Sequence, residues 1–243
     1  MKILALLLEI RRPPRFAISV LPSIPNSTMY RRNFLTLAAT ATTASSLALR
    51  AAQQSSPTSS PSTDIFMIGP LEGYSLQIGT LVSMMINMRA QVVHNVQGLL
   101  QPDLDFLLDS KANSIGALLL HLAATDTYYH LHTFQEKPWD SWDDAIKKQW
   151  DIPMNLGDRA RETIKGHDLK YYLDILEETR AKTFAEFRKR DDKWLLSRDK
   201  VSPTWGNYYS EWFHVCEHES NHDGQIKFLK ARLPNAKADH TAQ

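Results

Sequence analysis

Three histidines lie four residues apart near the end of the chain, in the stretch HVCEHESNHDGQIKF. On an α-helix, at 100° per residue, His214, His218 and His222 share one stripe, and the stripe also carries Glu211 and Gln225. Residues at i and i+4 have Cβ atoms about 5–6 Å apart, so two such imidazoles can reach one ion. A buried imidazole nitrogen without a partner costs about 1–3 kcal/mol, and a shared metal ion would satisfy two of them at once.

The position of this stripe on its helix decides whether a metal site is plausible. The helical wheel places the three histidines in the middle of the buried face, with Cys216 and Asp223 on the opposite side. The alternative to a metal site is a hydrogen-bonded polar layer, or a site in which only one histidine has a role. Three histidines on one stripe favour the metal ion.

A further histidine, His121, lies in the apolar stretch GALLLHLAATD, where the small Ala117 leaves room on the same face. An imidazole in such a helix would be explained if it met His218 and His222 across the core. Three neutral nitrogen ligands and an open position suit Zn²⁺, and Ni²⁺ or Fe²⁺ would also tolerate them. His132 lies some 16 Å further along the same helix and cannot join the same ion.

The stretch HESNH, residues 218–222, also matches the H-E-x-x-H pattern of zinc peptidases, in which the Glu is a general base. Those enzymes need a third ligand from a later Glu or His. No Glu follows His222, and the spacing to a later His fails as well. The sequence therefore does not favour a peptidase.

The elements that must position these side chains are helices. Apolar residues recur at helical spacing over four segments, and no alternating strand pattern is found. A Trp-rich connection, interrupted by Pro and Gly and holding one or two short helices, separates the second segment from the third. The sequence predicts an all-α four-helix bundle, in which metal sites are built from inward-pointing side chains of facing helices. The predicted helices span residues 74–100, 113–135, 168–190 and 205–233.

Two stretches, NSIGALLLHLAATD and HVCEHESNHDGQIKFLKARLP, resemble the DinB-like superfamily of metal-binding four-helix bundles. The resemblance covers residues 77–234 and is most specific at the H-x-x-x-H-x-G-Q ending of the last helix. It implies a divalent ion, commonly zinc or nickel, held by His121, His218 and His222. The additional His214 leaves open which histidines of the last helix bind.

The resemblance also suggests which polar neighbours orient the ligand imidazoles. Asp126 and Gln225 stand where the superfamily has polar neighbours of the site. Glu211, on the histidine stripe, is a further candidate for holding an imidazole in place. No catalytic acid or base can be assigned from the sequence.

Characterised members of the superfamily include isomerases and S-transferases that use a small cellular thiol. The resemblance therefore implies a divalent-metal-dependent enzyme acting on a small molecule, either a hydrolase or a thiol-dependent transferase. The alternative is a non-catalytic metal-binding or ligand-binding helical module that forms a homodimer. The 28 basic and 27 acidic residues give no electrostatic reason to expect a nucleic acid.

The N-terminal part of the chain differs in composition from the rest, because no Asp or Glu occurs between Ile10 and Thr63. Residues 29–54 resemble a twin-arginine signal peptide with Arg31 and Arg32 as the pair, which predicts export, to the periplasm. An organelle transit peptide and a cytoplasmic protein are the alternatives. No stretch reaches the ~18 apolar residues of a membrane span. We divide the chain into an N-terminal extension with signal peptide (1–52), a Ser/Pro-rich linker (53–65), the bundle (66–235) and a disordered tail (236–243).

Overall fold

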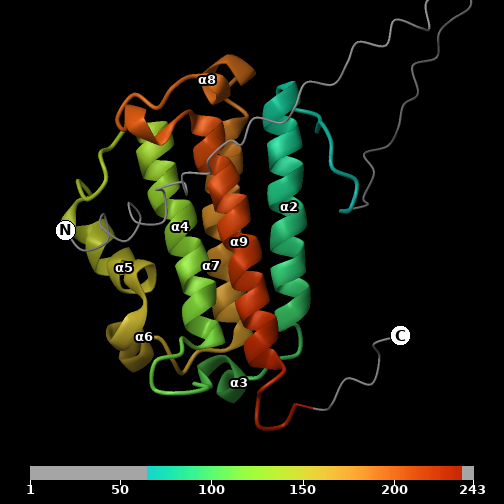
Figure 1. The fold of residues 1–243 in the computed structure, drawn as a ribbon, viewed down its shortest axis with the longest axis vertical. Helices are drawn as coiled ribbons and strands as arrows, with labels where there is room; N and C mark the ends of the chain where they lie inside the picture. The colour runs from blue at the N-terminus through green and yellow to red at the C-terminus, as the bar shows by residue number, and fades with distance from the viewer. Residues whose placement is uncertain (1–64, 237–243) are drawn as a thin grey trace, which may run out of the picture. The chain divides into compact units, whose positions relative to one another are not determined.

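The structure, a computed structural model, describes residues 65–236. The predicted signal peptide, nearly all of the predicted linker and most of the predicted tail lie outside this range. Within it the chain is helical and forms no strand, which confirms the predicted all-α class. Four long helices form a bundle (Figure 1): α2 (Leu76–Val96), α4 (Ile115–Gln135), α7 (Leu169–Phe187) and α9 (Tyr208–Lys230).

Each long helix packs against two others. In Figure 1, α9 lies in front, between α4 and α2, and α7 lies behind them. The long connection between α4 and α7 contains two short helices, α5 and α6, and α5 packs on α4. The remaining short elements cover the two ends of the bundle. The bounds are α5 (Asp144–Asn155), α6 (Gly157–Thr163), α3 (Gln101–Asp105), α8 (Asp192–Leu196) and the 3₁₀ turn η1 (Pro203–Trp205).

The long helices are shorter than the apolar pattern predicts, and glycines explain two of the differences. Helix α2 ends at Val96 because Gly98 adopts a left-handed conformation (φ 77°), which favours glycine and stops the helix. Before α9, Gly206 has φ 109°, and the side chain of Asn207 then accepts a hydrogen bond from the backbone N–H of Ser210. Helix α9 therefore begins after this cap rather than at the preceding turn.

Polar side chains cap the helices that carry the histidines and their neighbours. Ser114 accepts a hydrogen bond from the backbone N–H of Ala117 and so caps the start of α4. The first turn of α2 is capped from a distance, because the Asp192 carboxylate accepts the N–H groups of Gln77 and Ile78. A carboxylate at a helix N-terminus is also favoured by the helix dipole.

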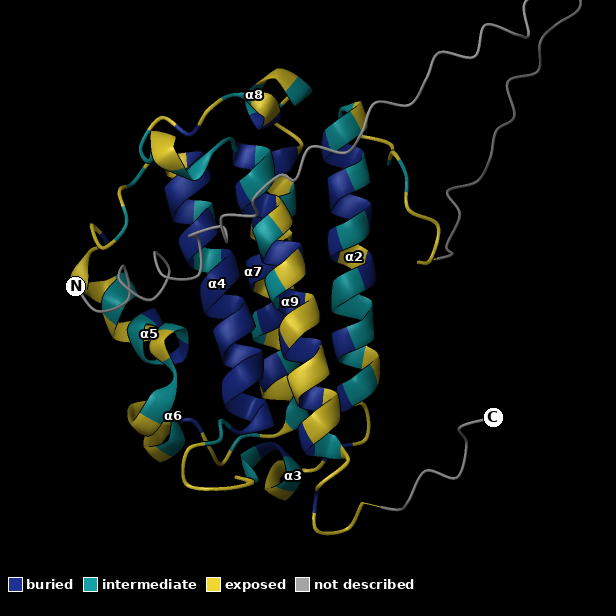
Figure 2. Ribbon diagram, viewed as in Figure 1, coloured by how far each residue is buried: buried dark blue, intermediate teal, exposed yellow. Residues whose placement is uncertain are grey.

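The interior contains two apolar clusters, one in each half of the bundle. Figure 2 shows that α4 is buried over most of its surface, whereas α9 has a broad exposed face. Four charged residues form ion pairs inside the bundle, one from each long helix, and all but the half-buried Arg89 are buried: Arg89, Asp126, Arg180 and Glu219. In α2, α7 and α9 the charged residue lies between the residues of one cluster and those of the other. We call these four residues the charged layer.

Among the described residues, none of the helices combines the length and the apolar character that crossing a bilayer requires.

Candidate metal centre

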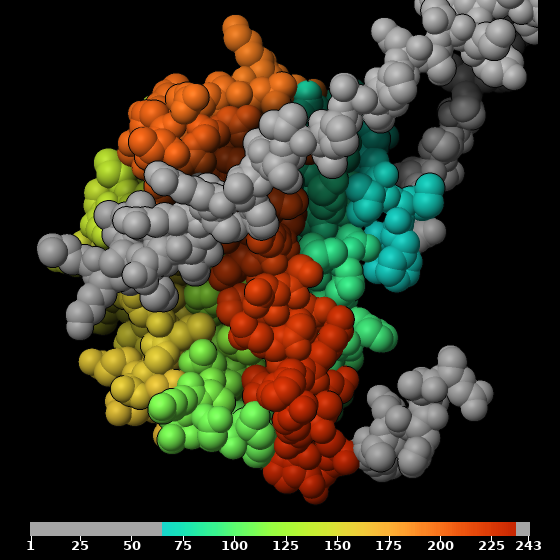
Figure 3. Space-filling model, in the orientation of Figure 1, coloured from blue at the N-terminus to red at the C-terminus, as the bar shows by residue number. Residues whose placement is uncertain are grey.

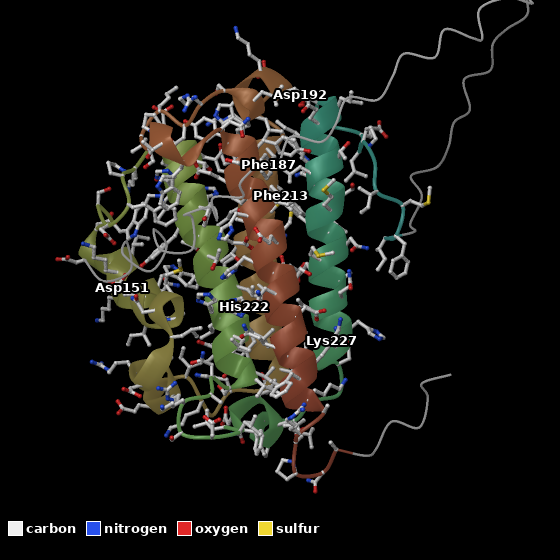
Figure 4. All side chains as sticks on the ribbon, viewed as in Figure 1. Asp151, Phe187, Asp192, Phe213, His222 and Lys227 are labelled. Atoms are coloured by element: carbon white, nitrogen blue, oxygen red, sulfur yellow. The ribbon has the colours of Figure 1, made fainter. Side chains whose placement is uncertain are left out.

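The imidazoles of α4 and α9 converge in the interface between these helices. The Nε2 atom of His218 lies 3.0 Å from Nε2 of His121 and 3.1 Å from Nε2 of His222. The residues are 97 positions apart in the first pair and four apart in the second. Figure 4 shows His222 on the side of α9 that faces α4. The three residues that the sequence predicted as ligands therefore meet at one point.

Hydrogen-bond partners fix the protons on two of these rings. His121 Nδ1 lies 3.0 Å from the carbonyl oxygen of Pro153, which can only accept, so this nitrogen donates and Nε2 keeps its lone pair. His222 Nδ1 likewise donates to Gln225 Oε1 at 3.1 Å. The Gln225 amide has this orientation because its Nε2 donates to Asn221 Oδ1.

Two lone pairs thus point at His218 Nε2, which carries one proton at most. The three facing Nε2 atoms therefore share too few protons, and a cation at the point where they meet would supply the missing positive charge. Three nitrogens at zinc-ligand distances of about 2.0–2.1 Å in tetrahedral geometry lie about 3.3 Å apart, close to the observed separations. In addition, His218 Nδ1 is buried without a hydrogen-bond partner. The donor set fits a divalent ion with an open coordination position.

Burial keeps these imidazoles in the form that binds metal. It lowers the pKa of His121 to about 4, with repulsion from His222 as the second cause. The pKa of His218 is lowered to about 2 by burial and then by the neighbouring imidazoles. Burial also lowers the pKa of His222. All three rings are therefore neutral at pH 7, as metal ligation requires.

The end of α5 supplies the carbonyl that holds His121. The last carbonyl groups of a helix have no partner inside it, and Pro153 is two residues before the end of α5. The turn that follows cannot satisfy the Pro153 carbonyl, because the N–H of Gly157 is directed to Asn113 Oδ1 instead. Leu156, which precedes Gly157, has φ 53°. The sequence did not predict this contact. Its only signal was the DIPMNLG stretch, in which Pro and Gly indicate a helix end.

The predicted orientation of α9 is wrong in one respect. Cys216 and Asp223, expected on the exposed side, are buried, and Glu219 between them is 1 % exposed. The centre of the buried face is therefore occupied by Glu219 of the charged layer, and the histidines lie at its border. A position at the border leaves the metal centre closer to solvent than the predicted central position would.

His214 does not join the other three rings. Its ring centroid lies 5.8 Å from that of His218, and its Nδ1 lies 3.4 Å from Glu217 Oε2 near the surface. The group of potential ligand atoms that lie within 4.8 Å of one another contains His121, His218 and His222 without it.

Two of the three residues predicted to orient the ligands do something else. Asp126 accepts hydrogen bonds from Arg180 Nε at 2.9 Å and from Arg89 Nη2 at 3.1 Å, so it belongs to the charged layer. Glu211 lies one turn before His214 and contacts His132, away from the metal centre. Gln225 is the one that bonds a ligand imidazole. A helical wheel cannot separate these cases, because the partners come from other helices.

Glu219, the acidic residue of HESNH, is also part of the charged layer. Its Oε2 lies 2.6 Å from Arg180 Nη2, and its Oε1 accepts a hydrogen bond from Arg89 Nε. The two arginines lower the pKa of this carboxyl, although burial opposes its ionisation. A carboxylate held by two guanidinium groups in the core is not placed to act as a general base, which supports the sequence argument against a peptidase.

A groove with a volume of about 660 Å³ runs between the loop before α4 and the exposed face of α9 (Figure 3). Leu118 of α4 lies at its base. The groove includes Gln225 and Asn221, the residues that orient His222, so it adjoins the metal centre. Its other polar or small residues are Asp109, Lys111, Ala112, Asn113, Ser220 and Gly224.

The comparison with protein families gives a match over most of the bundle. The family model described as mycothiol-S-transferase matches residues 80–234, a range that includes the three converging histidines. No curated protein matches the chain.

Proposed function

The chain belongs to the mycothiol S-transferase family, within the DinB-like superfamily, and on this premise we propose that it is a metal-dependent S-transferase. The reaction joins the sulfur of a small thiol to an electrophilic small molecule. The observation that carries the proposal is the convergence of three Nε2 atoms whose tautomers are set by Pro153 and Gln225.

The thiol must lose its proton to become a strong nucleophile, because the thiolate is the reactive form. A divalent ion held by three neutral imidazoles would lower the pKa of a bound thiol, and zinc and nickel both suit this donor set. The resident protein groups keep the donor set ready. His121 and His222 each hold their proton at Nδ1, so that both Nε2 lone pairs remain directed at the same point.

In the transfer, the sulfur forms a bond to the electrophilic atom while a leaving group departs with the electron pair of the broken bond. The groove next to the centre offers space for the reactants. Its amide groups, Asn113, Asn221 and Gln225, can donate and accept hydrogen bonds from a polar ligand. Leu118 and Phe228 add apolar surface.

The proposal is tested by metal analysis of the full chain, followed by thiol-consumption assays with an electrophilic dye. The thiols are mycothiol, glutathione and cysteine, each assayed with metal-loaded and with chelator-treated protein. We expect metal-dependent conjugation that His121→Ala abolishes. His94→Ala is the matched control, because His94 is exposed and far from the centre in sequence.

Other outcomes separate the alternatives. Hydrolysis of small esters without any thiol consumption would indicate a hydrolase that activates water at the same centre. Stoichiometric metal without turnover of either kind, together with unfolding on chelation, would indicate a structural ion and a non-catalytic module. Protein that folds and never retains metal would exclude both a metal-dependent enzyme and a structural ion.

A further inference from the structure

A second group of potential metal ligands lies at the other end of α4. His132, Asp199 and Glu211 have ligand atoms within 4.8 Å of one another, and their side chains are fully buried. His132 comes from the last turns of α4, Asp199 from the segment between α8 and η1, and Glu211 from the first turn of α9. His121 and His132 are about 16 Å apart along the helix axis, so this group is separate from the three-histidine centre.

The proton of His132 is assigned by its neighbours. Nδ1 lies 2.8 Å from the carbonyl oxygen of Lys137, so Nδ1 must donate. Nε2 then faces two carboxyl groups, at 2.8 Å from Asp199 Oδ2 and 3.7 Å from Glu211 Oε2. A ligand histidine in metalloproteins almost always donates its second nitrogen in this way, and His121 does the same with Pro153.

The two carboxyl groups need positive charge between them. Asp199 also contacts the Glu211 carboxyl, and burial of both groups would make a pair of bare anions costly. The Asp199 carboxylate accepts a hydrogen bond from the backbone N–H of Val201 at 2.8 Å, and its other oxygen, Oδ2, faces His132 Nε2. A cation placed between the imidazole nitrogen and the two carboxyl groups would balance their charge.

We propose that His132, Asp199 and Glu211 bind a divalent metal ion that ties the end of α4 to the start of α9. With a neutral imidazole, two carboxylates and one divalent cation, the cluster has no net charge, as full burial requires. One nitrogen and two or more carboxylate oxygens suit Zn²⁺, Fe²⁺ or Mn²⁺. The rings of Trp139 and Trp205 lie 4.9 and 6.2 Å from the His132 ring and shield this side of the site.

This ion is structural rather than catalytic, because no ligand side chain is exposed to a substrate. It would join the end of α4 to two segments that lie 67 or more residues further along the chain. An ion in a fully buried site enters during folding, so the site must be loaded while the chain refolds.

The competing arrangement contains two protons instead of the ion: an imidazolium at His132 and a protonated Glu211 that donates to Asp199. The two arrangements respond differently to Glu211→Gln. Glutamine reproduces the shape and the donor of a protonated glutamic acid, so the proton-linked cluster tolerates it. The same substitution removes one anionic ligand, so a metal site would not tolerate it.

The experiment refolds the full chain with Zn²⁺ or Mn²⁺, removes loosely bound ions and counts the retained ions by native mass spectrometry. The variants are Glu211→Gln, His132→Gln and His121→Ala. Glu217→Gln is the control, since Glu217 is exposed on the same helix.

We expect about two ions in the wild-type chain and in Glu217→Gln, and about one in each of the other three variants. Glu211→Gln should also lower the Tm of the metal-loaded protein. One ion in the wild-type chain, still present in Glu211→Gln and lost in His121→Ala, overturns the second site. If neither the wild-type chain nor any variant retained an ion, the proposed function would be overturned together with the second site. The two failures are therefore distinguishable.

Discussion

Glu219 Oε2 lies 2.6 Å from Arg180 Nη2 in the core of the bundle. The two residues next to Glu219 on α9, His218 and Ser220, are more exposed than Glu219. Arg180 also donates to Asp126, and Arg89 completes the charged layer. The charged layer joins all four long helices at one level. It therefore sets the rotation of α9, and with it the direction in which His218 and His222 point.

Glu219→Gln should destabilise the fold strongly. Removing one partner of a buried ion pair leaves uncompensated charge, at a cost of about 3–5 kcal/mol. The measurement is urea unfolding of the metal-free protein, with Glu217→Gln as the exposed control, expected within about 0.5 kcal/mol of wild type. A stable Glu219→Gln protein that has lost only activity would instead assign a catalytic role to Glu219.

Gln225→Leu should weaken metal binding without unfolding the protein. The Gln225 amide fixes the tautomer of His222, and loss of such a partner typically lowers metal affinity 10–100-fold. Since Gln225 is exposed, the fold has little to lose. Competition with a chromophoric zinc chelator measures the affinity. Unchanged affinity would show that the hydrogen bond to His222 is dispensable.

Metal-free protein should lose stability when the pH falls from 7 to 5. The folded-state pKa values of His121, His218 and His222 lie below the value of about 6.5 expected in the unfolded chain. Below pH 6.5 the unfolded chain therefore binds more protons than the folded one, which favours unfolding. Thermal unfolding with chelator at several pH values checks this. His218→Gln should show a smaller slope, and an equal slope in both proteins would contradict the assignment.

Two substitutions at Gly224 should have opposite consequences. Nothing lies within 4 Å of a Cβ added there, and the residue is inside α9, so Gly224→Ala should stabilise the helix by about 0.5–1 kcal/mol. Gly224→Leu would extend a larger side chain into the groove. We expect it to raise KM in the conjugation assay while metal content stays constant. An unchanged KM would exclude the groove as the substrate site.

Export through the twin-arginine pathway remains a prediction from the sequence, because Arg31 and Arg32 lie outside the described residues. Replacing both with Lys should retain a reporter fused to residues 1–65 inside the cell. Fractionation of periplasm and cytoplasm measures this. Equal export of the wild-type and substituted fusions would argue against the pathway.

The sequence by itself determined the helical class, the four long helices and the three histidines that converge, because these depend on periodicity and on residue type at fixed spacing. A 3.6-residue period places His218 and His222 side by side in any α-helix. The apolar surroundings of His121 were enough to indicate that this imidazole needs a partner in the core.

Only the tertiary structure decided which way α9 faces, that Asp126 and Glu219 pair with arginines, and that Glu211 belongs to a second cluster. It also revealed the Pro153 carbonyl that orients His121. The physical reason is that a buried polar group is stabilised by whichever partner another segment brings within hydrogen-bonding distance. Partners such as Arg180 and Asp199 are far away in the chain, and no local pattern encodes their approach.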